Sequence, residues 1–155
     1  EITANGFGTR HSAAGEWVYG YEMAVDPKLR GLRIGQRIYD ERKELVEQLD
    51  LHGIVIAGRM PGYLRTKRKV DGPKDYLDKV VQGKIRDQVV SFQLKNGFEP
   101  LGVLENYLPE DKQSDGHAAH LVWRNPYVDP DEAEDEHFSV YERGLERFDG
   151  ERLRA

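Results

Sequence analysis

A turn with two glycines separates an apolar segment from an amphipathic one, and this arrangement can bind an anion. Gly31 and Gly35 permit backbone conformations and close approaches that a Cβ would forbid. A helix is predicted to begin near Ile34, and its first turn would present unpaired N–H groups and the positive end of the helix dipole. The ligand that fits such a turn is a pyrophosphate group.

Two predicted elements position this turn. Residues 18–25 are rich in aromatic and β-branched side chains, which indicates a strand, and Pro27 then removes a ladder donor and forces the turn. Beyond the turn, apolar residues recur at helical spacing and predict an amphipathic helix with one apolar face, formed by Ile34, Ile38, Leu45, Val46 and Leu49. The strand therefore leads directly into the anion-binding turn.

The turn sequence Val25-Asp-Pro-Lys-Leu-Arg-Gly-Leu-Arg-Ile-Gly35 resembles the coenzyme-A pyrophosphate loop of the GNAT acetyltransferase superfamily, whose usual pattern is Val-x-Pro-x-x-Arg-Gly-x-Gly-x-Gly. Arg33 stands where that pattern has a glycine, and it either narrows the backbone's freedom or places a guanidinium beside a phosphate. The resemblance implies that acetyl-CoA, or another acyl-CoA, is bound by Val25, Arg30, Gly31, Leu32, Arg33, Ile34, Gly35 and Gln93.

A second motif, Phe92-Gln-Leu-Lys-Asn-Gly-Phe98, resembles the end of the last GNAT helix, which usually reads Phe-Tyr-x-x-x-Gly-Phe. Gln93 stands at the position of the tyrosine that protonates the leaving thiolate in many members, and a glutamine cannot supply that proton. Together with the runs at residues 59–63, 106–109 and 122–126, the chain is similar to GNAT-type domains fused to carbon–nitrogen hydrolases of the nitrilase class. In that subgroup Arg33 and Gln93 look normal, and no nitrilase-like segment follows Pro126.

The resemblance covers roughly residues 3–126 and implies an α/β (α+β) fold. We expect a GNAT-like mixed, mostly antiparallel sheet with splayed central strands, flanked by helices. A complete GNAT fold places a strand, two helices and two more strands before the strand predicted at residues 18–25, and only seventeen residues precede it here. We therefore expect that this portion is absent, because the chain is a fragment of a longer protein or because the missing half of the sheet comes from elsewhere.

Composition predicts one soluble domain. The chain has 155 residues, 33% of them charged, and no apolar run approaches the ~18 residues that suggest a membrane span. The absence of cysteine excludes disulfides, a thiol nucleophile and cysteine-ligated zinc, and it permits a cytoplasmic setting. The five histidines lack metal-ligand spacing with acidic neighbours, so no metal is predicted.

Charge divides the chain near Pro126. Residues 1–126 have a net charge of +1 and form the predicted acyl-CoA-binding domain, with an insert at residues 59–88 that is either a lid or specificity wall or a structural cover of the sheet. Residues 127–155 have a net charge of −6 and form an acidic extension. Within it, the helical spacing of Phe138, Tyr141, Leu145 and Phe148 predicts an amphipathic helix that packs on its own domain or binds a partner.

Five cations gather without an intervening acid: Arg59, Arg65, Lys67, Arg68 and Lys69. Solvated loop charge is the first interpretation, and attraction of the adenosine 3′-phosphate or of an acidic acceptor is the second. Nucleic-acid binding comes last, because the domain is not basic overall, and no nucleic-acid partner is predicted.

The resemblance implies N-acetyltransferase chemistry, in which an amine of a small molecule or protein directly attacks the acyl thioester. Alternation along the predicted strand puts Glu22 opposite the side of Tyr21, Met23 and Val25, which makes it either the candidate base or an ordinary exposed glutamate. No acid stands out, and Tyr63 or Tyr107 would serve only if the fold brought one near the sulfur.

Two other readings remain open. One is a non-catalytic coenzyme-A-binding module that regulates, or is fused to, an associated hydrolase. The other is a scaffold that has lost the ligand. A second copy of the chain is a further partner that the sequence permits.

Overall fold

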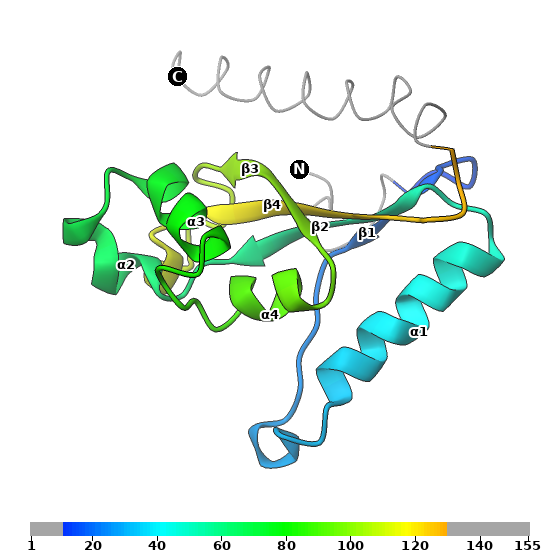
Figure 1. The fold of residues 1–155 in the computed structure, drawn as a ribbon, viewed down its shortest axis with the longest axis horizontal. Helices are drawn as coiled ribbons and strands as arrows, with labels where there is room; N and C mark the ends of the chain where they lie inside the picture. Colours follow the sequence, from blue (N-terminus) through cyan, green and yellow to red (C-terminus); the bar gives the residue numbers. More distant parts are fainter. Residues whose placement is uncertain (1–10, 130–155) are drawn as a thin grey trace. The chain divides into compact units, whose positions relative to one another are not determined.

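The computed structural model describes residues 11–129 (Figure 1). The chain divides into two compact units, Glu1–Asn125 and Pro126–Ala155, and all helices and strands of the described residues belong to the first. The helix predicted at residues 138–148 lies outside the described residues, and the predicted domain boundary at residue 126 stays a prediction.

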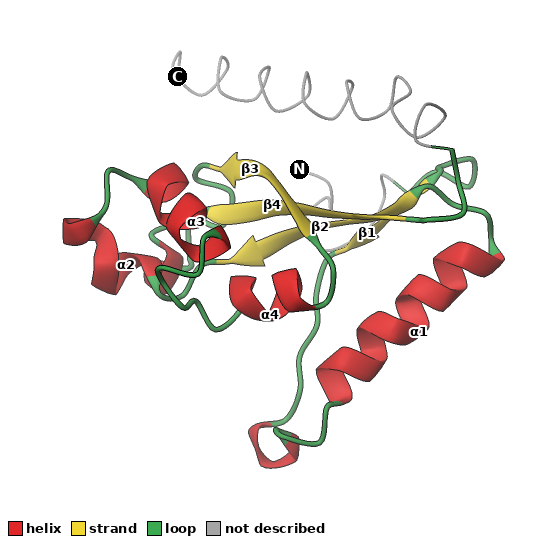
Figure 2. Ribbon diagram, viewed as in Figure 1, coloured by secondary structure: helices red, strands yellow, loops and turns green. Residues whose placement is uncertain are grey.

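A four-stranded mixed sheet forms the centre of the first unit (Figure 2). Its strands are β1 (Trp17–Gly20), β2 (Gly53–Arg59), β3 (Glu99–Leu104) and β4 (Ala118–Arg124), in the order β1-β2-β4-β3. The β1–β2 pair is parallel, whereas β2–β4 and β3–β4 are antiparallel. The predicted α/β class with a mixed, mostly antiparallel sheet is therefore confirmed.

Within residues 11–129, four α-helices accompany the sheet: α1 (Ile34–Gln48), α2 (Tyr63–Thr66), α3 (Pro73–Val81) and α4 (Val90–Lys95). Helix α3 lies in the predicted insert and begins at a proline, whose fixed φ suits a first helical position. It buries Tyr76, Leu77 and Val80, whereas Val81 is 45% exposed. No helix within residues 11–129 is long and apolar enough to cross a bilayer.

Helices α1 and α4 pack against the same face of the sheet. Tyr39 and Val46 of α1 join Val90 of α4 and the inward side chains of β2 in one buried cluster. The Tyr39 ring lies 5.0 Å from the Phe98 ring and 5.7 Å from the Phe92 ring, measured between centroids. This aromatic contact fixes α1 relative to α4, and the Lys43 ammonium adds a hydrogen bond to the Asn96 carbonyl at the end of α4.

The buried face of α1 differs from the predicted one. Tyr39 is 2% exposed and Val46 is fully buried, whereas Leu45 and Leu49 are 51% and 57% exposed. The helix carries two apolar stripes, and the aromatic contacts of Tyr39 decide which stripe meets the sheet. The other stripe borders an open groove of about 650 Å³, lined by Ile34, Arg37, Ile38, Glu41, Arg42, Glu44, Leu45 and Gln48.

Candidate functional site

The first strand separates from its neighbour halfway along the sheet. The strand predicted at residues 18–25 is wrong in its second half, because β1 ends at Gly20, which pairs with Ile56. Strand β2 continues to Arg59 and stays paired with β4 on its other side. Residues 57–59 therefore have no strand partner on the β1 side within the described chain, and we call them the open edge (Figure 1). Their backbone polar groups on that side are available to a ligand.

The chain leaves the sheet at residue 21 and forms the predicted glycine turn. A short 3₁₀ helix, Pro27–Leu29, follows Asp26, whose carboxylate accepts a hydrogen bond from the Lys28 N–H at 2.8 Å. Gly31 has a φ of +89°, and Arg33 has a φ of 56° in the left-handed region. Arg33 thus adopts the conformation for which the family pattern uses a glycine, and its guanidinium remains exposed.

Helix α1 begins directly after Arg33 with an open amino end. No side chain caps it, and the first intrahelical bond runs from the Arg37 N–H to the Arg33 carbonyl at 3.0 Å. The N–H groups of residues 34–36 therefore point out of the helix without an intrahelical acceptor. No acidic side chain lies in the first turn of α1, whereas Lys28, Arg30, Arg33 and Arg37 are all exposed around it. The turn combines unpaired donors, a helix dipole and excess positive charge.

Gly35 is required by the packing around it rather than by an unusual backbone conformation in the glycine turn. A Cβ built at Gly35 would lie 3.2 Å from Cζ of Phe92 and 3.7 Å from Cε of Met23. Its backbone is not in the left-handed region. The glycine therefore allows α4 and the segment after β1 to approach the start of α1, and a larger side chain there would disturb packing rather than fill only the anion site.

Gln93 lies beneath the open edge. It comes from α4, is 7% exposed, and its Oε1 atom would lie 2.2 Å from a Cβ built at Gly58. The second motif of the sequence therefore meets β2 at the point where β1 has parted from it. Gln93 and the glycine turn are brought to neighbouring parts of α4 and α1, since Phe92 contacts Gly35.

Glu22 lies in the segment that has left the sheet, so strand alternation does not orient it. Its side chain is exposed, and its backbone carbonyl accepts a hydrogen bond from Arg42 Nη2 at 3.0 Å. Tyr21, predicted to share an apolar side with Met23, is 60% exposed. The predicted orientation is thus wrong, whereas the role of Glu22 as base stays a prediction.

The two tyrosines considered as acids occupy different surroundings. Tyr63 is buried against Tyr76 and His117, and burial raises the pKa of its phenol. The hydroxyl of Tyr107 is hydrogen-bonded to that of Tyr19 on β1. The raised pKa makes Tyr63 a poor proton donor, whereas Tyr107 contacts β1, the strand that parts from β2 at the open edge.

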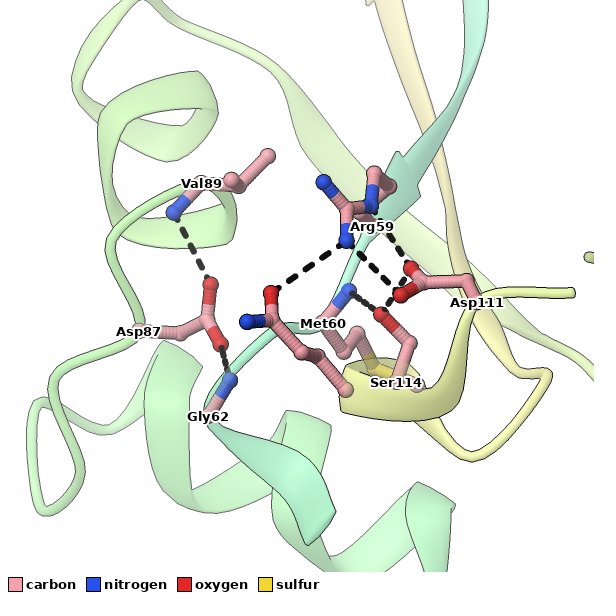
Figure 3. A network of polar contacts seen from close by, with 8 residues as sticks. Arg59, Met60, Gly62, Asp87, Val89, Asp111 and Ser114 are labelled. Carbon is pink, nitrogen blue, oxygen red and sulfur yellow. Dashed lines mark hydrogen bonds and ion pairs between the residues drawn. The ribbon is translucent and has the colours of Figure 1, made fainter. Parts of the chain in front are cut away.

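An ion pair fixes the end of the open edge (Figure 3). Arg59 donates to both carboxylate oxygens of Asp111, at 2.6 and 2.7 Å, and this contact lowers the pKa of Asp111 to about 2. The Asp111 carboxylate also accepts a bond from the Ser114 hydroxyl at 2.6 Å, and Ser114 Oγ accepts one from the Met60 N–H at 2.9 Å. Lys67 is paired with Asp115, so two of the five clustered cations have acidic partners, which favours the reading as loop charge.

Asp87 is a structural residue that the sequence analysis did not identify. It is fully buried, and its carboxylate accepts bonds from the N–H groups of Gly62 and Val89, both at 2.9 Å (Figure 3). It also accepts bonds from the Val90 N–H at 3.0 Å and from the Tyr76 hydroxyl at 2.7 Å. An aspartate two and three residues before the N–H groups it caps is a helix-start signal that could have revealed it. Asp87 joins the end of β2, helix α3 and helix α4 in one hydrogen-bonded unit.

The described residues contain no group of three or more His, Asp or Glu side chains arranged to hold a metal ion.

Known proteins resemble this chain in sequence. No protein-family model matches the chain. It is 39% identical over 125 residues to "Probable hydrolase YhcX" of Bacillus subtilis (strain 168), covering 81% of this chain and 24% of that protein. It is 31% identical over 127 residues to "Uncharacterized N-acetyltransferase YkwB" of the same organism, covering 82% of this chain and 55% of that protein. The chain thus spans about a quarter and about half of these relatives.

A solved structure shares the fold. It is the GphF GNAT-like decarboxylase in complex with isobutyryl-CoA, with a TM-score of 0.64 and 23% sequence identity, covering 79% of this chain and 63% of that one. At this identity the likeness concerns the fold.

Proposed function

We propose that this chain, which has a GNAT-like fold, binds acetyl-CoA or another acyl-CoA and transfers the acyl group to an amine. The observation that carries the proposal is the parting of β1 from β2 after Gly20, followed along the chain by the glycine turn and the open amino end of α1. The solved neighbour holds an acyl-CoA, and one relative is named an N-acetyltransferase, which supports the same ligand class here.

The residues present suit such a ligand. The backbone of Val25 and of residues 30–35 would hold the pyrophosphate, with Arg33 beside it, and the cations of the turn would attract the 3′-phosphate. The open edge would pair with the amides of the pantetheine arm, in the way that a sheet edge accepts an extended peptide. Coenzyme A supplies the activated thioester, and the chain supplies binding and orientation.

The transfer itself makes modest demands on the protein. The amine nitrogen forms a bond to the acyl carbon, the carbon–sulfur bond breaks, and the ammonium proton passes to a base, for which we propose Glu22. Gln93 has no proton to donate. A thiol has a pKa of about 8.5, so the thiolate is a tolerable leaving group near neutral pH without an acid.

A non-catalytic role is the second candidate. Gln93 replaces the usual acid, and the chain spans 24% of a relative named as a probable hydrolase. In this reading the domain binds coenzyme A and influences a fused or associated hydrolase or a second copy of the chain. A cytoplasmic setting is proposed for either role.

Calorimetry with acetyl-CoA, followed by an assay of free-thiol release across a panel of amines, tests the proposal. We expect saturable binding, and thiol release that depends on an amine and falls on Glu22→Gln while coenzyme affinity stays unchanged. Glu16→Gln, another exposed glutamate close to β1, is the matched control. Binding without thiol release would favour the non-catalytic role. Carbon dioxide release from a carboxyacyl-CoA without an amine would assign decarboxylation instead. Absence of any binding would refute the proposal.

A further inference from the structure

The side chains of the open edge point to two different faces of the sheet. Gly58 faces helix α4, because a Cβ built there would lie 2.2 Å from Oε1 of Gln93. Side chains alternate along a strand, so Ala57 and Arg59 point to the opposite face. Helix α4 covers the first face, whereas the Arg59 side chain on the other is 50% exposed. A molecule that reaches the open edge from solvent therefore approaches on the side of Arg59.

Arg59 uses only part of its hydrogen-bonding capacity. Its Nε and Nη2 atoms donate to the two carboxylate oxygens of Asp111 (Figure 3), and Nη2 also donates to Oε1 of Gln113 at 3.3 Å. Each terminal nitrogen of a guanidinium carries two N–H groups. No residue of the described chain accepts a hydrogen bond from Nη1 of Arg59. The N–H groups of Nη1 are therefore available to a ligand at the end of the open edge.

The contacts around Asp111 keep this guanidinium in one position. The Asp111 side chain is only 10% exposed, and its carboxylate accepts a hydrogen bond from the hydroxyl of Ser114, which is fully buried. The same hydroxyl accepts a bond from the N–H of Met60, the residue that follows the open edge. A cation fixed in this way loses little conformational entropy when it binds an anion. Arg59 is thus preorganised, unlike a freely moving surface charge.

A carboxylate is the ligand that suits this group. The planar guanidinium matches a carboxylate in geometry, and Asp111 already offsets one charge, so a singly charged anion fits better than a phosphate. The segment after the open edge adds further positive charge. Arg65, Arg68 and Lys69 are exposed, and none of them forms an ion pair within the described residues. This surface therefore attracts anionic molecules toward Arg59.

We propose that the acceptor amine carries a carboxylate and that Arg59 binds this carboxylate through Nη1. This inference rests on the proposed function and names the acceptor class, which is amino acids and other amino carboxylates. The coenzyme would occupy the backbone of the open edge, and the acceptor would lie on the Arg59 face with its amine toward the thioester. Arg59 would select and orient the acceptor without exchanging a proton with it.

Paired acceptors, each supplied as the carboxylate and as the carboxamide, test this inference in the assay of free-thiol release. The panel consists of the common α-amino acids and β-alanine. We expect Arg59→Gln to raise KM for the carboxylates about tenfold at nearly unchanged kcat, and to change KM for the carboxamides less than about twofold. Arg65→Gln, at an exposed cation of α2, is the matched control and should change neither KM.

Asp111→Asn separates acceptor binding from a structural role of the ion pair. If the pair were only structural, Arg59→Gln and Asp111→Asn would have the same effect, because each breaks the same contact. If Arg59 binds the acceptor, Asp111→Asn should keep or lower KM for the carboxylates, because the cation remains and its competing carboxylate is removed. The double variant Arg59→Gln/Asp111→Asn leaves no unpaired carboxylate, and it should raise this KM as Arg59→Gln does even if the single variant folds poorly.

Calorimetry adds a measurement without turnover. Free coenzyme A has no acyl group to transfer, so the preferred amino acid can be titrated into its complex with the chain, and Arg59→Gln should weaken this binding about tenfold. Equal KM values for the unaltered chain and Arg59→Gln would overturn the inference. A preference for malonyl-CoA over acetyl-CoA that Arg59→Gln removes would also overturn it, because the carboxylate would then belong to the acyl group. Absence of thiol release with every amine would instead refute the proposed transferase, so the two failures are distinguishable.

Discussion

Arg33 stands where the family pattern has a glycine, and the structure shows which backbone conformation it adopts there. Its φ of 56° is the left-handed conformation that a glycine adopts freely and that costs an L-residue roughly 1–2 kcal/mol. The two readings left open by the sequence are therefore compatible. The backbone is strained, and the guanidinium stands exposed at the open amino end of α1. Local strain at a ligand-binding turn is common where the side chain contributes to binding.

Replacing Arg33 separates strain from charge. We expect Arg33→Gly to raise the free energy of unfolding by about 0.5–1 kcal/mol, because it relieves the left-handed strain. It should also weaken coenzyme A binding about fivefold and reduce the salt dependence of binding, because one phosphate contact is lost. Arg33→Ala should weaken binding equally without the gain in stability. Urea unfolding measures the change in stability, and calorimetry at two salt concentrations measures the change in binding. Equal stability of Arg33→Gly and Arg33→Ala would show that the backbone at Arg33 is not strained.

At the scale of elements, α1 shows how a correct helix prediction can still assign the wrong face. Periodicity identified the helix and its start at Ile34, as the structure confirms. Periodicity alone could not show whether the stripe of Tyr39 or that of Ile38 faces the sheet. Both stripes are apolar, and successive residues of a helix differ in direction by only about 100°. The choice depends on Phe92 and Phe98, which come from a distant part of the chain.

Adjacent residues of α1 provide a direct test. Val46→Ala should lower the free energy of unfolding by about 2 kcal/mol, since the side chain is fully buried in the core. Leu45→Ala removes more carbon atoms but should cost less than ~0.5 kcal/mol, since that side chain is half exposed. Urea unfolding of the two variants measures the difference. A larger loss for Leu45→Ala would mean that the stripe bordering the groove is the buried one.

At the site too, short sequence patterns predict some features, whereas others depend on contacts between residues far apart in the chain. The glycine turn and the start of α1 follow from short sequence patterns, and the structure has them near the predicted positions. The end of β1 at Gly20 was not predictable, because residues 21–25 have the composition of a strand and only the absence of a pairing partner decides otherwise. The packing of Gln93 against Gly58 likewise joins residues 35 positions apart, and no single motif contains both.

At the scale of the whole molecule, the polar groups inside the sheet determine how the fold responds to acid. His120 lies in the middle of β4, paired with Ala57 on one side and Gly102 on the other, and it is 5% exposed. Burial lowers its pKa to about 4. Asp111 behaves differently, because its contact with Arg59 holds its pKa near 2 and keeps it charged in the folded state. The two groups therefore affect stability in separate pH ranges.

His120 should make the fold sensitive to mild acid. In the unfolded chain its pKa is about 6.5, so between pH 6.5 and 4 the unfolded state binds a proton that the folded state does not. The contribution of His120 to the free energy of unfolding should be fully present above pH 6.5. The free energy of unfolding should then fall as the pH decreases toward 4, by an amount on the order of 2–3 kcal/mol. Asp111 adds a further loss only below pH 4, where its carboxylate begins to bind a proton in the unfolded state.

Urea unfolding between pH 7.5 and 4.5 measures the slope of the free energy of unfolding against pH. His120→Gln should flatten it, whereas His11→Gln, at an exposed position, should leave it unchanged. An unfolding free energy that stays constant from pH 7 to 5 in the unaltered chain would show that His120 titrates normally and is reached by solvent.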